Sequence, residues 1–443
     1  MRTPTKRRSI RKAGGKANDD EVVPGLVARQ GALHLISAVL DRGDMLDEAG
    51  MRGSPAERAE AHGLADVTLR RLGQIDAVLE RFVDKMPKTP VSHILRLMAA
   101  ELIFVGTAPH AAVDLGVRMV KRVRGASKFS GMVNAVGRRL AEHGAEIAAG
   151  QDAALLNASD WLREELSADW GGEAARAMAV AHLTPAPHDL TLANPAKAEA
   201  LPIEATVLPS GSLRLTARPQ ISALPGYNEG AWWLQDAAAA LPARLIAQPD
   251  GKRVLDVCAA PGGKTLQLAA AGAQVTALDI SARRIERVTE NLTRTGLTAE
   301  IVVADALGWT PPMLFDAILL DAPCSSTGTI RRHPDLPRRQ GGIDLAALTT
   351  LQARLLDRTA KWLVPGGVLV FCTCSLFKAE GEDQAHGFLE RNTDFERAPI
   401  DPVEAGIPAE FITSEGDLRT RPDFWAELGG IDGFFAARFR RKT

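Results

Sequence analysis

The sequence predicts a multidomain protein in which an all-α N-terminal domain precedes an α/β doubly wound domain. The 443 residues suffice for two or three domains of ordinary size. In the first third of the chain, apolar residues recur at the three-to-four-residue spacing of amphipathic helices. From about residue 229, short apolar runs instead alternate with helical segments, which is typical of parallel sheets covered by helices.

The first segment, residues 1–22, is basic, with Lys6, Arg7 and Arg8 among its cations, and contains few large apolar side chains. We expect a mobile tail, because so little apolar surface cannot offset the entropy lost on ordering. No apolar stretch follows these charges, and the chain has no run of about 18 apolar residues, so we expect neither a signal peptide nor a membrane span. The expected location is the cytoplasm.

Residues 23–148 carry the helical pattern, for example at Ile94, Leu97 and Met98, and predict one domain of several short helices. Residues 149–228 are less regular and punctuated by prolines, and they predict a linker with a small α/β subdomain. The formal charge of −1 comes from 53 basic and 54 acidic residues, so any charged partner must be recognised by local patches.

Residues 229–443 contain the candidate strands of the α/β domain. Buried strands separated by helices predict a mostly parallel sheet, in which ligands gather at the carboxyl ends of the strands. The chemically interesting residues all follow such ends, which indicates one shared site. The candidate strands are 253–258, 274–280, 300–305, 316–323 and 367–374.

The first of these strands runs into a loop of small residues that precedes a helix. Small residues let the backbone approach a ligand, and a helix N-terminus offers free N–H groups to its polar atoms. A phosphate-loop interpretation of GGKT is weakened because GxxxxGK[ST] needs glycine at Cys258, and GxGxxG is also absent. We predict cofactor contacts from Cys258, Ala259, Ala260, Pro261, Gly262, Gly263 and Lys264.

Two aspartates follow the next two strands. Asp279 ends the second strand, where a carboxylate can accept both hydroxyls of a ribose, and Asp305 ends the third, near the expected place of an adenine amino group. An adenosine without a pyrophosphate is what S-adenosylmethionine presents. The alternative is that both are ordinary cap or turn aspartates.

Cys324 and Cys374 follow the fourth and fifth strands. One such cysteine is usually a small buried hydrophobe, but two beside a cofactor loop indicate thiolate chemistry. Methylation of a pyrimidine at C5 needs a thiolate, because addition at C6 makes C5 nucleophilic. Asp321, which ends the fourth strand, is the candidate for contact with N3 of the base and with the cofactor. Cys258 and Cys372 are interpreted as packing residues, and without paired CxxC spacing no metal is expected.

Several long strings in the chain resemble one family. They are similar to the bacterial 16S ribosomal RNA cytosine-5 methyltransferases of the Sun/Fmu type, and the stretches 93–104 and 128–140 resemble the NusB-type helical fold that precedes the catalytic domain there. The matching strings are LDVCAAPGGKT (255–265), LDISARRIERVTENLTRTG (278–296), DAPCSSTGTIRRHPD (321–335), FCTCS (371–375) and GFFAARF (433–439).

The resemblance implies a Rossmann-like methyltransferase domain, S-adenosylmethionine as the methyl donor and RNA as the substrate. It also implies that Cys374 of the TCS motif is the nucleophile, whereas Cys324 of the PC motif assists release of the product. DNA cytosine-5 enzymes attack with the cysteine of their PC motif, so the presence of both motifs favours RNA. The chain departs from the family pattern at 234–243, where a serine is expected, and at 375–383, where a proline with Glu-Asn is expected.

Arg331, Arg332 and His333 follow the PC motif and are predicted to contact RNA phosphates, the alternative being solubilising surface charge. Two further functions stay open: a transfer RNA cytosine-5 methyltransferase, and an RNA-binding or antitermination factor with a vestigial catalytic domain. The NusB-like half favours ribosomal RNA by analogy alone. We expect a monomer. On the helical half, the cations that either face RNA or form ordinary charged helix faces are Lys121, Arg122, Arg124, Lys128, Arg138 and Arg139.

Overall fold

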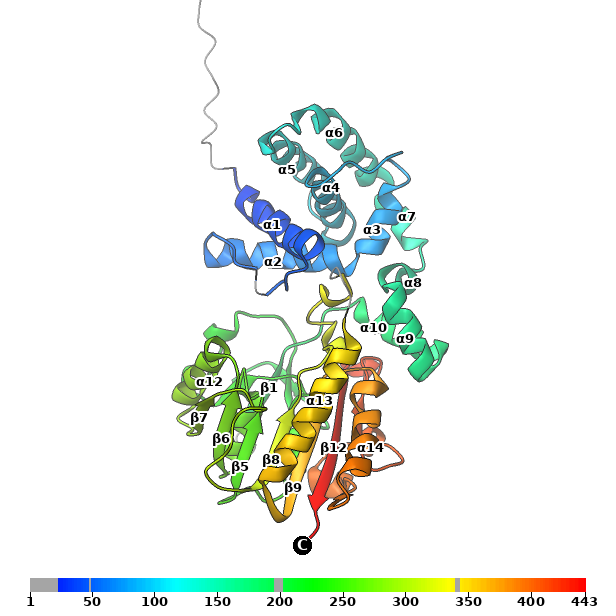
Figure 1. Ribbon diagram of the computed structural model, residues 1–443. Helices are drawn as coiled ribbons and strands as arrows, with labels where there is room; N and C mark the ends of the chain where they lie inside the picture. Colours follow the sequence, from blue (N-terminus) through cyan, green and yellow to red (C-terminus); the bar gives the residue numbers. More distant parts are fainter. Residues whose placement is uncertain (1–22, 48, 195–201, 339–342) are drawn as a thin grey trace, which may run out of the picture.

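The computed structural model describes residues 23–47, 49–194, 202–338 and 343–443, so the tail predicted at 1–22 lies outside the described residues. Figure 1 shows the N-terminal helices stacked above a twisted sheet that is flanked by helices. The carboxyl ends of the parallel strands point toward the N-terminal helices (Figure 1). Within the described ranges, every helix is too short or too polar to cross a membrane.

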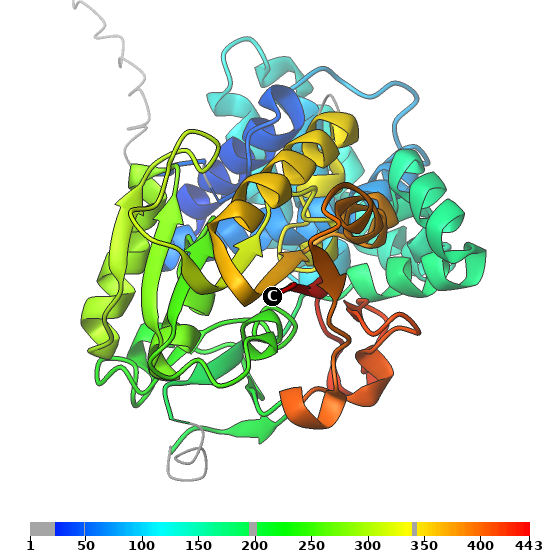
Figure 2. The same cartoon turned by 60° about the horizontal axis from the view of Figure 1, so that its bottom comes forward.

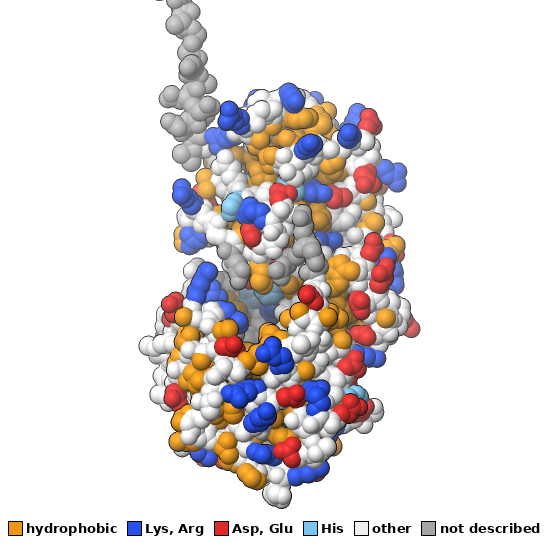
Figure 3. All heavy atoms as spheres, in the orientation of Figure 1, with side chains coloured by type: hydrophobic (Ala, Val, Ile, Leu, Met, Phe, Trp, Pro, Cys, Tyr) orange, Lys and Arg blue, Asp and Glu red, His pale blue; other side chains and the backbone are white. Residues whose placement is uncertain are grey.

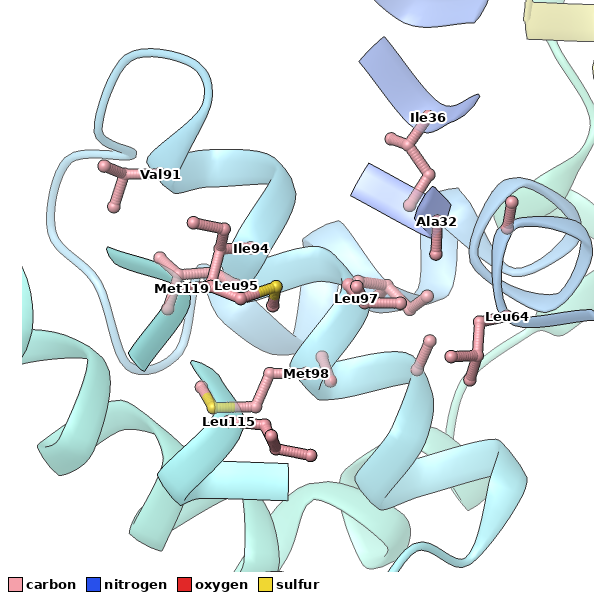
Figure 4. Close-up of a cluster of buried hydrophobic side chains, with 14 of the residues drawn as sticks. Ala32, Ile36, Leu64, Val91, Ile94, Leu95, Leu97, Met98, Leu115 and Met119 are labelled. Atoms are coloured by element: carbon pink, nitrogen blue, oxygen red, sulfur yellow. The ribbon is translucent and has the colours of Figure 1, made fainter. Parts of the chain in front are cut away.

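The N-terminal helices pack around α4 (Val91–Ala100), almost all of whose residues are buried. A helix that is buried on nearly every side belongs in the centre of a bundle. Figure 4 shows Ile94, Leu97 and Met98 of α4 among side chains of neighbouring helices, including Leu115. Burying each such side chain contributes about 1.5–3 kcal/mol. The other helices are α1 (Leu26–Arg42), α2 (Pro55–Arg70), α3 (Leu72–Leu79), α5 (Pro109–Arg122), α6 (Ser130–Arg139) and α7 (Ala145–Ala149).

Three short helices and a small sheet connect the two main parts of the chain. The helices are α8 (Ala153–Asn157), α9 (Asp160–Trp170) and α10 (Gly172–His182). The sheet is antiparallel throughout, in the order β2-β3-β1-β4. Its last strand lies beyond residue 228, where we had predicted the linker to end, because Trp232 and Trp233 pair with β1. The strands are β1 (Asp189–Leu192), β2 (Ala205–Val207), β3 (Leu213–Leu215) and β4 (Trp232–Leu234).

The large sheet confirms the doubly wound prediction and adds antiparallel strands to it. Its order is β10-β12-β9-β8-β5-β6-β7, with β11 also paired to β12. The strands from β9 to β7 in this order are parallel to one another, as predicted. They are β5 (Arg253–Val257), β6 (Gln274–Asp279), β7 (Glu300–Val303), β8 (Phe315–Asp321) and β9 (Leu363–Thr373); the others are β10 (Phe395–Arg397), β11 (Leu418–Thr420) and β12 (Phe434–Arg441).

Apolar side chains cover both faces of this sheet. Neighbouring residues of a strand point to opposite faces, so Leu319 belongs to one core cluster and Ile318 to another. The first cluster includes Leu268 of α11, whereas the second includes Leu356 of α13 and Phe388 of α14. Figure 2 shows α13 and α14 on one side of the sheet and the small sheet on the other. The helices are α11 (Gly263–Ala270), α12 (Ala282–Thr295), α13 (Leu345–Thr359), α14 (Glu382–Arg391) and α15 (Pro402–Ala405).

The segment that follows the PC motif, residues 331–338, lies between the N-terminal helices and the large sheet. Asp335 is 1% exposed and accepts a hydrogen bond from the amide of Leu46, 3.1 Å away. Arg338 donates to the carbonyl oxygens of Leu69 and Asn157, at 3.2 and 2.5 Å. A loop of the sheet therefore holds the helical domain in place over the carboxyl edge.

Candidate active site

The loop after β5 is shaped by close packing of its backbone. Gly262 has a φ of 105°, and a Cβ there would lie 3.1 Å from Val288, so a larger residue is disfavoured both by conformation and by space. The side chains of the described residues leave the N-terminus of α11 uncapped. Free N–H groups of this helix therefore point toward the space that the loop encloses.

Asp279 is the last residue of β6, next to β5, and Asp305 follows the end of β7, next to β6. Asp279 is 2% exposed, and its carboxylate accepts from the amides of Ala260 and Ser281, at 3.1 and 2.9 Å. Asp305 is exposed and accepts from the amide of Leu307 at 2.9 Å. Both carboxylates therefore stabilise turns, as the alternative interpretation expected. Neither carboxylate is saturated, since each carries about four lone-pair sites.

Asp321 and Lys264 form an ion pair between the cofactor loop and the end of β8. Lys264 Nζ lies 2.8 Å from Asp321 Oδ2 and 5.0 Å from the ring centroid of Phe434. Burial alone would lower the pKa of Lys264, but Asp321 outweighs burial and raises that pKa above its ordinary value. The Asp321 side chain is 29% exposed, so a bound molecule can still reach it.

Cys324 and Cys374 come together at the carboxyl edge of the sheet. Their sulfur atoms are 3.5 Å apart, and Cys374 Sγ is also 3.6 Å from Ser326 Oγ. The backbone ties the two loops together as well, because Gly328 N donates to Cys374 O at 2.9 Å. Neither cysteine is sealed, since both are half-buried.

The hydrogen bond between the two thiols separates their acidities. A Cys324 thiol that donates to Cys374 lowers the pKa of Cys374, and burial acts against this. The same bond raises the pKa of Cys324 well above the usual cysteine range. Because the thiolate is the nucleophilic form of cysteine, these two pKa shifts favour Cys374 over Cys324 as the nucleophile of the pair.

The geometry can now be compared with known proteins. A family model described as 16S rRNA methyltransferase RsmB/F matches residues 243–440, and one of the NusB family matches residues 26–142. The ribosomal RNA small subunit methyltransferase B of Xanthomonas campestris is 35% identical over 441 residues, covering 93% of this chain and 97% of that protein. The chain belongs to the RsmB/F family.

Two other proteins extend this relationship. The ribosomal RNA small subunit methyltransferase B of Xylella fastidiosa (strain Temecula1) is 34% identical, covering 94% of this chain and 98% of that protein. The crystal structure of PH0851 superposes with a TM-score of 0.70 at 21% identity, covering 95% of this chain and 99% of that one. At that identity the superposition supports the fold alone, and it confirms the predicted order of a helical domain followed by a Rossmann-like domain.

Membership of the RsmB/F family makes this chain an S-adenosylmethionine-dependent methyltransferase, as predicted. The residues beside the loop after β5 fit that cofactor. Asp279 offers a carboxylate, and Ile280, which follows it, is 69% exposed and presents an apolar surface suited to a flat ring. The narrow loop and the helix N-terminus accommodate a ligand's polar groups without requiring a phosphate.

The structure corrects the prediction for Arg331 and Arg332. Arg331 is 3% exposed and donates to the carbonyl oxygens of Thr184 and Gly429, at 3.3 and 2.6 Å. Arg332 pairs with Asp432 at 2.7 Å and with Asp236 at 2.5 Å. Both guanidinium groups are engaged inside the protein, so they hold the loop rather than offer free charge to RNA phosphates.

For His333, contact with RNA phosphates stays a prediction. Its side chain is 31% exposed and lies 3.4 Å from Asp47 of the N-terminal domain. Two other arginines follow in this loop: Arg338 is held by backbone carbonyls, and Arg339 lies outside the described residues. The sequence could not distinguish these cases, because the partners of each arginine lie far away along the chain.

Cys258 and Cys372 lie where packing residues were predicted. Cys372 is 0% exposed within the core cluster that includes Leu319, and burial raises its pKa well above the usual range. Cys258 packs at the edge of the opposite cluster, and burial raises its pKa to about 12. Among the described residues, no group of three His, Cys, Asp or Glu side chains is arranged to hold a metal ion.

Sequence reasoning missed the buried polar groups beneath the two cysteines. Glu380 is 0% exposed and accepts hydrogen bonds from Ser325 N, Ser375 Oγ and Gln352 Nε2. The only available signal was the position of Ser325 and Ser375, each directly after a cysteine. A glutamate six positions after Cys374 reads as a surface residue in a sequence.

Proposed function

We propose that this chain methylates C5 of a cytosine in small-subunit ribosomal RNA through a transient covalent bond between Cys374 and C6. The observation that carries this proposal is the 3.5 Å contact between Cys374 and Cys324 at the carboxyl edge of the sheet. The names of the related proteins support ribosomal RNA as the substrate. We further propose that the chain acts as a monomer, which light scattering can test.

The cofactor contacts assigned in this proposal follow the strand ends. Asp279 would hold the ribose and Asp305 the adenine. The backbone of residues 258–263, which includes Ala259, Ala260 and Pro261, would line the remainder of the cofactor. When bound, S-adenosylmethionine supplies an electrophilic methyl group. Lys264 would hold Asp321 in position through their ion pair.

The reacting residues would then act in sequence on the base. The thiolate of Cys374 forms a bond to C6, and the ring electrons gather at C5, which becomes nucleophilic. Asp321, protonated or becoming protonated during the reaction, donates a hydrogen bond to N3 and stabilises the negative charge that develops on the ring. After C5 carries the methyl group, a base takes the C5 proton, the electrons of that C–H bond restore the C5–C6 double bond, and those of the C6–S bond leave with the thiolate of Cys374. Cys324 is placed beside Cys374 to assist that release.

A target base must leave its stack to reach two half-buried cysteines. Figure 3 shows a hollow between the N-terminal helices and the sheet domain, with Lys and Arg side chains along one side. Figure 1 places α12 on that side of the sheet domain. Arg283 and Arg287 of this helix are exposed. These cations, together with His333, are the candidates for contact with RNA phosphates.

The proposal is tested by incubating the full chain with labelled S-adenosylmethionine and unmodified small-subunit ribosomal RNA. We expect labelled 5-methylcytosine after nuclease digestion. Unmodified transfer RNA in a parallel reaction tests the alternative substrate. Label in another nucleoside, or in transfer RNA alone, would refute the proposal as stated. Tight RNA binding without any methyl transfer would instead favour the RNA-binding factor.

A further inference from the structure

A single buried carboxylate joins the loops that carry the two cysteines. Glu380 belongs to the short turn Lys378–Glu380 and is 0% exposed. Its Oε1 accepts from the backbone amide of Ser325 at 2.9 Å, and its Oε2 accepts from the hydroxyl of Ser375 at 2.6 Å. Ser325 follows Cys324 and Ser375 follows Cys374, so the carboxylate contacts the residue next to each thiol.

Gln352 completes this connection from α13. Its side-chain amide, which is 0% exposed, donates to Glu380 Oε1 and to the carbonyl of Pro323, both at 2.9 Å. Pro323 precedes Cys324, so the PC motif is held on both sides of its cysteine. The hydroxyls of Ser325 and Ser375 are also 3.0 Å apart. The contacts of Glu380 and the pair of serine hydroxyls fix one cysteine loop relative to the other, and Gln352 ties the loop of Cys324 to α13.

The cost of this arrangement argues against mere filling of space. A carboxylate removed from water is expensive to bury, and apolar residues of similar volume are often as stable or more so. The network also reaches the thiols electrostatically. The hydrogen bond to Cys374 is the main cause that raises the pKa of Cys324, burial is the second, and Glu380 adds to both. A negative charge on this side keeps Cys324 in its protonated, donating form.

We propose that Glu380 is a positioning residue for the covalent step. It keeps Cys324 within hydrogen-bond reach of Cys374, so that one thiol remains protonated while the other attacks the base. This inference rests on the proposed roles of the two cysteines. Glu380 touches neither the base nor the cofactor in this assignment, and its effect passes entirely through the two loops.

The experiment compares wild type, Glu380→Gln and Glu390→Gln in the full chain. Glu390 is an exposed residue of α14, so its substitution removes a nearby charge without touching the network. Affinity for S-adenosylmethionine reports whether the fold and the cofactor loop are intact. Single-turnover formation of the covalent complex is measured with RNA containing 5-fluorocytidine, whose fluorine cannot leave as the C5 proton does.

We expect Glu380→Gln to retain cofactor affinity but to form the complex roughly 100-fold more slowly, the effect of a displacement of about 1 Å. Its pH–rate profile should also move to higher pH, because Cys374 loses the donor that lowers its pKa. Glu390→Gln should match wild type in all three measurements. Glu380→Asp keeps the charge but is one methylene shorter, so it should be slow as well.

A folded Glu380→Gln that forms the complex at the wild-type rate and with the wild-type pH profile would overturn the inference. If that variant loses cofactor affinity, Ser375→Ala decides, because it removes one contact of the carboxylate and little volume. A slower covalent step at unchanged cofactor affinity in Ser375→Ala supports the inference, whereas a wild-type rate contradicts it. Absence of a complex with the wild-type chain would refute the proposed function. This outcome differs from failure of the inference, in which the wild type and Glu380→Gln form the complex at the same rate.

Discussion

Cys324 and Cys374, which contact each other, differ from the packing residues Cys258 and Cys372 in how their neighbours shift the pKa of the thiol. The sulfur atoms of Cys374 and Cys324 are 3.5 Å apart, and this contact lowers the pKa of Cys374, which favours its thiolate. Cys372 instead donates to Asp321, 3.5 Å away, and burial favours its neutral form. Only Thr373, the last residue of β9, separates Cys372 from Cys374. The contacts of each sulfur atom, more than its position in the sheet, therefore give the two thiols opposite pKa shifts.

The largest expected difference between Cys372 and Cys374 appears when each is replaced by alanine. Cys374→Ala should lose methyl transfer by roughly 10⁴-fold or more, as enzymes do when the nucleophile is deleted. Cys372→Ala should remain within about threefold of wild type, because it loses only a weak hydrogen bond. Initial rates with labelled S-adenosylmethionine measure both. Equal losses in the two variants would mean that the thiols do not differ as described.

Removal of the partner thiol should change the outcome of the reaction. Cys324→Ala should attack the base but release the product slowly, so that protein linked to RNA accumulates. Denaturing gel electrophoresis after incubation with RNA and S-adenosylmethionine detects this complex. The double variant Cys324→Ala/Cys374→Ala is the control and should give no complex. A complex that persists in the double variant would place the covalent bond elsewhere.

Alkylation by iodoacetamide tests the acidity difference directly, because only thiolates react. Cys374 should be alkylated at lower pH than an ordinary cysteine, since its pKa is lowered. In Cys324→Ala that donor is gone, so the pH at which Cys374 reacts should rise. Mass spectrometry of the peptides resolves each cysteine. Cys258 should resist alkylation until strongly alkaline pH, since its pKa is raised to about 12.

The smallest effect concerns stability. Cys372→Ala leaves a void of about one sulfur atom among Leu319, Val370 and their neighbours, and should lower the free energy of unfolding by about 1 kcal/mol. Urea denaturation measures this loss. Cys324→Ala, at a half-buried position, should lose less. A larger loss of stability in Cys324→Ala than in Cys372→Ala would contradict the interpretation of Cys372 as the packing residue.

The parts of this fold that the sequence could predict are those set by local patterns. The strands from β5 to β9 and the small residues after β5 follow from hydrophobic runs, turn residues and spacing within about ten positions. The two cysteines could be singled out because each follows such a strand. The helical domain was likewise visible in the spacing of Ile94, Leu97 and Met98, which the structure places together in one core.

The parts that could not be predicted depend on contacts between distant segments. Arg332 reads as a surface cation until Asp236 and Asp432, roughly a hundred positions away on either side, are seen to bind it. Strand β12 is visible in the sequence only as part of the string GFFAARF, because no local pattern indicates that it pairs antiparallel with β9. Glu380 was missed for the same reason, since its three hydrogen-bond donors come from three different elements.

The loop from Arg331 to Arg338 has a consequence for protein engineering. Because Asp335 and Arg338 bond to backbone groups of the helical half, the surface that this half meets is built by the segment next to Cys324. A chimera that exchanges the helical half for that of a relative must therefore exchange this segment with it. For such an exchange the helical half and this segment form one unit, although the folds of the two halves could each be recognised separately.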